Sequence, residues 1–214
     1  MPLCRCLVAV LLTCTANSPV VHGADDAVDV SLIFREDWRE TPAATPVTQQ
    51  HVASPDLILS LHGPGGQAVK KSHHDEIVND PWYVWSGLCE DRWAISLRPR
   101  ERIADLSGPA RIRWRIKQSG PQVLKLVLEL ANGHWLVSQQ GFGETPDWHV
   151  FQQPLAKLIW RELDIRTIKA GKRIADPDLT RVRSVGWTDL STGKGSPAST
   201  RVDWIEVHGR LPSN

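Results

Sequence analysis

One segment of this sequence alternates polar and apolar side chains without a break, and it restricts the fold more than any other feature. The segment is Arg111–Lys117, which reads Arg-Ile-Arg-Trp-Arg-Ile-Lys. Successive side chains of a β-strand point to opposite faces, so Ile112, Trp114 and Ile116 would share one face and the cations would share the other. The pattern predicts a half-buried β-strand with a strongly basic outer surface.

The rest of the chain carries further strand patterns separated by turn signals. Leu124–Leu130 is expected to pair antiparallel with Arg111–Lys117, and Asn132-Gly133 predicts a tight hairpin turn after it. Asp37–Pro55 has little periodicity and is expected to be an extended loop. Other expected elements are strands at Trp82–Gly87, Arg92–Leu97, Asp147–Phe151, Leu163–Ile168, Val182–Thr188 and Arg201–Val207, and a short helix within Pro154–Trp160. Many short strands at this spacing predict an all-β fold, a single jelly-roll β-sandwich of antiparallel strands with few short helices.

The first 23 residues have the features of a cleaved secretory signal peptide. Arg5 supplies a positive charge, Leu7–Leu12 begins a short apolar stretch, and Gly23 suits cleavage before Ala24. We therefore expect a secreted or periplasmic protein whose one domain spans residues 24–214. A buried N-terminal strand and lipid anchoring at Cys14 are the alternatives.

Charge and cysteine content exclude several classes of function. The chain has 25 Lys and Arg against 24 Asp and Glu, which argues against nucleic acid as the main partner, because phosphate binding needs an excess of cations. No apolar run reaches the roughly 18 to 20 residues that span a bilayer. Beyond the leader Cys89 is the one cysteine, so no intramolecular disulfide is expected, and Cys89 is interpreted as a small buried hydrophobe.

Several segments resemble galactose-binding-like jelly rolls. They are Asp105–Gly108 leading into Ile112–Ile116, Trp148 followed by Pro154–Leu158, and Asp178–Trp187 combined with the closing segment Val202–Gly209. The whole chain is also similar to secreted proteins of concanavalin-like jelly-roll type that are grouped with family 16 glycoside hydrolases and 3-keto-disaccharide hydrolases. The resemblance implies a protein that binds or cleaves an oligo- or polysaccharide.

The acidic motif of family 16 hydrolases is incomplete in this chain. That motif is Glu-x-Asp-x-(x)-Glu on one strand, whereas Glu162-Leu163-Asp164 lacks the third carboxylate. In Asp203-Trp204-Ile205-Glu206, strict alternation would put the two carboxylates on opposite faces. A retaining glycosidase needs two carboxyl groups about 5 Å apart. The family 16 mechanism therefore does not follow from the resemblance.

His73, His74 and Asp75 are the candidate catalytic residues. An imidazole beside a carboxylate can transfer protons or contribute to a metal site. His73 and His74 would point to opposite faces of an extended segment, so they could not easily share one metal ion. A polar surface loop is the alternative interpretation.

Trp82, Tyr83 and Trp85 are the candidate sugar platform, because a flat aromatic ring packs against the C–H face of a pyranose. In a strand, Trp82 would face away from Tyr83 and Trp85, and core packing is the alternative for each tryptophan. The other indoles divide into those expected mainly in the core and those expected near turns at accessible positions. The first group is Trp93, Trp114, Trp160, Trp187 and Trp204, and the second is Trp135 and Trp148.

Arg115 and Lys117, on the basic side of the alternating strand, are further candidate ligand-binding residues. Like charges on one strand face repel each other unless an anion lies across them. That anion would be an acidic side chain on a neighbouring strand, such as Glu129, or an acidic glycan, which arginine binds in bidentate geometry. Asp189 and Asp203 are candidates for hydrogen bonds to sugar hydroxyls or for a structural calcium ion.

Functions of different class therefore remain open. One is a secreted hydrolase or lyase that holds a glycan in a concave sheet face, with His74 and Asp75 as proton movers. The second is a non-catalytic carbohydrate-binding module-like jelly roll that binds through Trp82, Trp85 and the basic strand. The third is a structural or interaction domain whose tryptophans only fill the core.

Overall fold

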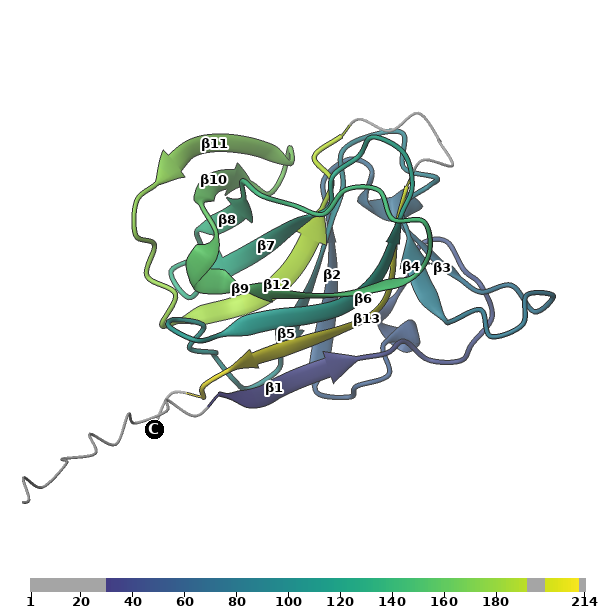
Figure 1. Cartoon of the computed structure of the whole chain (residues 1–214), viewed down its shortest axis with the longest axis horizontal. Helices are drawn as coiled ribbons and strands as arrows, with labels where there is room; N and C mark the ends of the chain where they lie inside the picture. The colour runs from purple at the N-terminus through teal and green to yellow at the C-terminus, as the bar shows by residue number, and fades with distance from the viewer. Residues whose placement is uncertain (1–29, 192–198, 212–214) are drawn as a thin grey trace, which may run out of the picture.

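Two antiparallel β-sheets form the framework of residues 30–191 and 199–211, the part of the chain that the computed structural model describes (Figure 1). The six-stranded sheet contains β1 (Ser31–Glu36), β3 (Lys70–Ser72), β4 (Tyr83–Trp85), β6 (Arg111–Gln118), β9 (His149–Pro154) and β13 (Thr200–Gly209). The seven-stranded sheet contains β2 (Leu57–His62), β5 (Ala94–Pro99), β7 (Lys125–Leu130), β8 (Trp135–Ser138), β10 (Trp160–Asp164), β11 (Lys169–Ile174) and β12 (Val182–Thr188). The predicted all-β jelly-roll sandwich is confirmed.

Helical structure in the described ranges is limited to short 3-10 turns. These are η1 (Gln49–His51), η2 (Gly66–Ala68) and η3 (Leu155–Lys157). The helix expected within Pro154–Trp160 is thus reduced to η3. None of the helices in the described ranges is long and apolar enough to span a bilayer.

The strand β6 lies between β13 and the edge strand β9 of the six-stranded sheet. The prediction that it pairs with Leu124–Leu130 is wrong, because that segment forms β7 of the opposite sheet. Both strands turn their apolar faces to the common core, which requires the intervening connection to cross from one sheet to the other. The predicted hairpin at Asn132-Gly133 is confirmed: β7 pairs with β8, and Gly133 has a φ of 85°.

The expected strand at Leu163–Ile168 is also wrong, since β10 ends at Asp164 and a turn follows before β11. The Asp164 carboxylate accepts hydrogen bonds from the backbone N–H of Arg166 and from the Thr167 hydroxyl, at 3.0 and 2.8 Å. A short acidic side chain that binds its own backbone in this way favours a turn over an extended strand.

The core between the sheets is built from strand faces and from the loop after β1. Along β6, burial alternates as predicted, with Ile112, Trp114 and Ile116 all at 0% exposure. The expected loop at Asp37–Pro55 is irregular apart from η1 and still contributes buried apolar side chains, Trp38 among them. Cys89 is buried as expected, and burial raises the pKa of its thiol to about 12.

A buried carboxylate fastens that loop to β1. Glu36 is 0% exposed and accepts hydrogen bonds from the backbone N–H groups of Trp38, Ala53 and Ser54 at 2.8, 2.7 and 3.0 Å. Burial raises its pKa, although the three donors oppose that effect. One side chain therefore ties both ends of the loop together.

A β-bulge in β13 sets the face on which its second half presents each side chain. Val202 pairs with Ile116 of β6 and Trp204 pairs with Arg115, so Asp203 is an extra residue. The extra residue reverses the alternation. Val202, Ile205 and Val207 accordingly all lie in the core. Trp204 was expected there too, and that prediction is wrong: the bulge turns its indole to the outer face, where it is half-buried.

The seven-stranded sheet is strongly curled. His62 on β2 and Trp135 on β8 are separated by three strands, so they would be roughly 19 Å apart in a flat sheet with strands about 4.8 Å apart. Their ring centroids are 4.9 Å apart. The concave face that the curl encloses contains a second apolar cluster, formed by Ala94, Val127, Val137, Leu163 and Ile168. The concave face expected to hold a substrate is therefore filled, over this stretch, by the protein's own side chains.

Lys71 is an unusual member of the interior. It is 0% exposed, and its ammonium has no hydrogen-bond partner among the residues that the structure describes. The nitrogen lies 4.0 Å from the ring centroid of Trp82, and this cation–π contact replaces part of the lost hydration. Burial lowers the pKa of Lys71 to about 8.

We expect Lys71→Met to raise the free energy of unfolding at pH 7, by at most about 3 kcal/mol. Below pH 8 the lysine is charged in both states, and burying it has its full cost. Between pH 8 and its ordinary pKa of 10.5, the folded protein has released a proton that the unfolded chain still holds, so the wild type gains stability with rising pH. Urea unfolding at pH 7, 8, 9 and 10 measures this, with Lys70→Met on the surface as the matched control. Identical pH profiles of wild type and Lys71→Met would contradict it.

Ile168→Ala should destabilise the protein by about 2–5 kcal/mol, because it opens a cavity under the curled sheet. Ile77→Ala is the matched control, since Ile77 is 51% exposed, whereas Ile168 is 0% exposed. Thermal unfolding followed by circular dichroism compares the two. Equal melting temperatures would show that the concave face is not a second core.

Candidate functional site

The outer face of the six-stranded sheet gathers cations and indoles from five strands and the segment before β9, and is here named the basic face. The register places Lys70, Trp85, Arg201 and Lys117 side by side across β3, β4, β13 and β6. The other members of the face come from β1, β4, β6, β13 and the residue before β9. They are Arg35, Tyr83, Arg111, Arg113, Arg115, Trp148, Trp204, Glu206 and His208.

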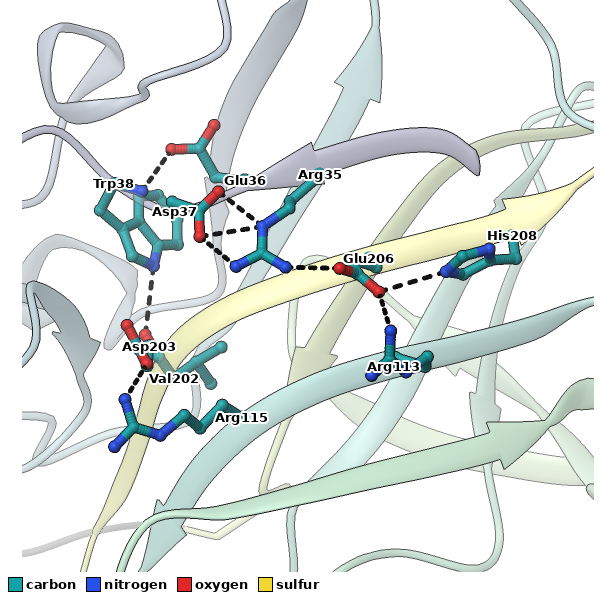
Figure 2. Close-up of polar contacts among 10 residues, drawn as sticks. All are labelled: Arg35, Glu36, Asp37, Trp38, Arg113, Arg115, Val202, Asp203, Glu206 and His208. Atoms are coloured by element: carbon teal, nitrogen blue, oxygen red, sulfur yellow. Dashed lines mark hydrogen bonds and ion pairs between the residues drawn. The ribbon is translucent and has the colours of Figure 1, made fainter. Parts of the chain in front are cut away.

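Glu206 is the centre of an ion network on this face (Figure 2). Arg113 donates to its carboxylate at 2.8 Å, Arg35 reaches it from β1, and His208 lies at 3.2 Å. Arg35 also pairs with Asp37. Burial alone would raise the pKa of Glu206, but the hydrogen bonds from His208 and Arg35 and the charge of Arg113 outweigh it and hold the pKa below its ordinary value.

Asp203 also forms an ion pair on the basic face. Arg115 donates to its carboxylate at 2.7 Å. Strict alternation placed Asp203 and Glu206 on opposite faces, and that expectation is wrong, because the bulge lets both carboxylates reach cations of β6. Burial raises the pKa of Asp203, and the hydrogen bond from Arg115 opposes that shift.

The cations of β6 are therefore balanced mainly by nearby carboxylates. Lys117 pairs with Asp147 at 3.1 Å, in addition to the pairs of Arg113 and Arg115. Glu129, named from the sequence as a partner, lies in the opposite sheet, where it accepts a hydrogen bond from Ser184 at 2.5 Å. Glu129 cannot neutralise the cations of β6, because β6 and β7 belong to different sheets.

Three half-buried indoles on the basic face each contact at least one cation. The guanidinium carbons of Arg35 and Arg113 lie 4.5 and 5.7 Å from the ring centroid of Trp204. That of Arg115 lies 5.3 Å from the centroid of Trp148. Cation–π contacts of this kind hold a ring in one orientation.

Trp85, the third of these indoles, lies between two cations. The Lys70 ammonium is 5.7 Å and the Arg201 guanidinium carbon 5.8 Å from its ring centroid. The indole N–H donates to the Ser199 hydroxyl. A Cβ added at Gly87 would lie 1.9 Å from the indole, so only glycine at that position leaves room for the ring.

The structure separates the candidate catalytic histidines. His74 lies at the border of the basic face, with its Nδ1 atom 2.9 Å from Asp80 and 3.1 Å from the Tyr83 hydroxyl. Tyr83 in turn packs edge-on against Trp148 at 5.3 Å between centroids. The partner of His74 is thus Asp80 and not Asp75.

His73 instead stacks on Trp82, with centroids 3.9 Å apart. Trp82 packs against the core and against Lys71, so it does not join Tyr83 and Trp85 in one platform. Asp75 is 3.2 Å from His73, and its side chain is 97% exposed. His73, Asp75 and Trp82 therefore lie apart from the indole platform of the basic face.

Asp189 also lies away from the basic face, just beyond β12 of the seven-stranded sheet. Its carboxylate accepts a hydrogen bond from the backbone N–H of Ser191 at 3.0 Å, and burial raises its pKa. No group of three or more His, Cys, Asp or Glu side chains within residues 30–191 and 199–211 could hold a metal ion.

Sequence reasoning missed part of the face. Asp80 is joined to His74 by two successive turns, in which Ile77 donates to the His74 carbonyl and Asp80 to the Ile77 carbonyl, both at 3.1 Å. The charged residues Lys70 and Arg201 reach the face only through strand pairing. Of the two indoles expected near turns, Trp148 is on the basic face, and Trp135 is in the opposite sheet beside His62.

The comparisons with known proteins concern overall structure. No family model and no curated protein matches the chain. A solved family 11 carbohydrate-binding module, of the cellulosomal cellulase Lic26A-Cel5E of Clostridium thermocellum, is 13% identical, with 88% of this chain and 99% of that chain covered and a TM-score of 0.43. A family 11 module from Clostridium thermocellum in complex with a β-1,3-1,4-mixed-linked tetrasaccharide is 12% identical, with coverages of 86% and 98% and a TM-score of 0.41. An exo-β-agarase is 10% identical, with 76% of this chain and 24% of that chain covered and a TM-score of 0.36. The site described above therefore rests on the contacts of this chain's own side chains.

Proposed function

We propose that this protein binds an oligo- or polysaccharide on the basic face. The observation that carries the proposal is that Trp85, Trp148 and Trp204 are held on one sheet face against cations instead of being packed in the core. An indole offers apolar area to the C–H face of a pyranose, and its N–H is a hydrogen-bond donor. Such a surface suits a ligand that is apolar on its ring faces and polar at its edges.

The arginines beside these rings supply donors for sugar hydroxyls. A guanidinium carries five N–H donors, and Arg115 uses one nitrogen for Asp203. Arg113 likewise uses one nitrogen for Glu206. The ion pairs fix these side chains before a ligand arrives, which lowers the entropy lost on binding. The proposed ligand agrees with the export that we infer from residues 1–23.

Cleavage of the glycan, by hydrolysis or elimination, is the second candidate function. It is favoured by the contact of His74 with Asp80 and Tyr83, because an imidazole bound to a carboxylate can move a proton. Tyr83, however, is only 2% exposed, and burial raises its pKa, so its hydroxyl remains protonated and covered. Binding without turnover is therefore the function that the geometry supports better.

Trp204→Ala and Trp148→Ala should each weaken polysaccharide binding tenfold or more, which corresponds to about 1.4 kcal/mol. Each substitution removes a ring from the platform. Affinity electrophoresis in gels containing soluble polysaccharides, followed by calorimetry on those that retard the protein, measures the change. Trp135→Ala, which removes a half-buried indole of the opposite sheet, is the control. If Trp135→Ala lost binding and the other two variants kept it, the binding site would lie on the seven-stranded sheet and not on the basic face.

His74→Ala should leave the affinity for polysaccharide within about threefold of wild type, and neither protein should release reducing ends or unsaturated products. The reason is that His74 borders the platform and contacts Asp80 and Tyr83 of the protein itself. His73→Ala serves as the neighbouring control. Product release by wild type that is abolished in His74→Ala and kept in His73→Ala would establish the enzyme instead.

A further inference from the structure

The cations of the basic face fall into a neutralised group and a group without counterions. Arg35, Arg113, Arg115 and Lys117 each pair with a carboxylate. Lys70, Arg111 and Arg201 have no carboxylate within ion-pair distance in the described part of the chain. The whole chain has a formal net charge of only +1, so this is a local separation of charge and not a general excess.

Lys70 and Arg201, two of these cations, lie on either side of Trp85. Strand pairing puts both opposite Trp85, and their charged groups lie 5.7 and 5.8 Å from its ring centroid. Arg201 is further anchored by a hydrogen bond to the Ser119 hydroxyl at 3.2 Å. Strand pairing thus fixes the backbone positions of the ring and the two cations, and the hydrogen bond to Ser119 also orients Arg201.

Two acids near this row, in the described part of the chain, are already bound to other side chains. Asp80 is near the row, but its carboxylate accepts two hydrogen bonds from His74, at 2.8 and 2.9 Å. Asp147 is engaged with Lys117. Lys70 and Arg201 lie on β3 and β13, the two neighbours of β4, so both charged groups flank the same indole. Among residues 30–191 and 199–211, these two cations therefore have no counterion, and an anionic ligand would supply one.

We infer that the saccharide bound on the basic face is acidic, with a carboxylate or sulfate group that contacts Lys70 and Arg201 next to Trp85. This inference rests on the proposed carbohydrate binding. Arginine binds either oxyanion in bidentate geometry, and lysine adds a point charge. The half-buried indole between them supplies the surface for the sugar ring that carries the group.

Matched polymers test the charge requirement on the full-length protein. Polygalacturonate is compared with its methyl ester, and dextran sulfate with dextran, so that each pair differs only in the anionic group. We expect at least tenfold tighter binding of one or both acidic members in calorimetry at low salt. The preference should shrink as salt is raised toward 1 M, because exposed charges are then screened. Equal affinity within both pairs would overturn the inference.

Substitutions test which residues produce the preference for acidic polymers. Lys70→Met combined with Arg201→Met should abolish the preference, which is measured as the ratio of the affinity for the acidic polymer to that for its neutral counterpart. Lys169→Met combined with Arg173→Met removes the same charge from exposed positions of β11 and should keep the preference. A preference that survives the first pair, or that the second pair also removes, would contradict the inference. Circular dichroism confirms that each variant is folded.

The two proposals fail in different ways. If wild type binds none of the four polymers or any other polysaccharide, carbohydrate binding itself is wrong. If wild type binds neutral and acidic members equally and Trp204→Ala loses both, carbohydrate binding stands and the acidic ligand is wrong.

Discussion

The bulge at Asp203 in β13 is the constraint on which the outer surface of the six-stranded sheet depends. One extra residue keeps Val202 and Ile205 in the core and turns Trp204 and Glu206 outward. Asp203 itself reaches Arg115. Without the extra residue, strict alternation along β13 would either turn a carboxylate into the core or turn an aliphatic side chain to the outer face. The insertion thus allows one strand to serve the core and the ion network together.

Electrostatic balance then divides this surface into two parts. Around Glu206 the cations are neutralised, and their role is to hold the indole of Trp204 between two guanidinium groups. Around Trp85 the same combination of ring and cations occurs, and no carboxylate of residues 30–191 and 199–211 pairs with Lys70 or Arg201. In our proposal, the neutralised half supports the indoles and the half around Lys70 and Arg201 binds the anionic group of the ligand. The opposite sheet offers no comparable surface where its concave side is filled around Ile168.

The parts of this structure that were predictable from sequence depend on local periodicity, and the others depend on pairing over long distances. The alternation in β6 predicted its buried and exposed faces correctly, and the hairpin after β7 followed from Asn132-Gly133. Trp204 was assigned to the wrong face, because a bulge shifts the alternation by one residue and has no fixed sequence pattern that would reveal it. The contact of His62 with Trp135 arises from sheet curvature, which local sequence does not encode.

The most direct measurement of the central claim is an NMR titration of the indole N–H signals with acidic oligosaccharides. The sequence contains ten tryptophans, so buried and surface indoles report side by side in one spectrum. The account predicts that the signals of Trp85, Trp148 and Trp204 shift on binding, while those of the buried Trp93, Trp114 and Trp187 stay in place. Shifts confined to Trp135 would contradict it, because the ligand would then lie on the curled seven-stranded sheet.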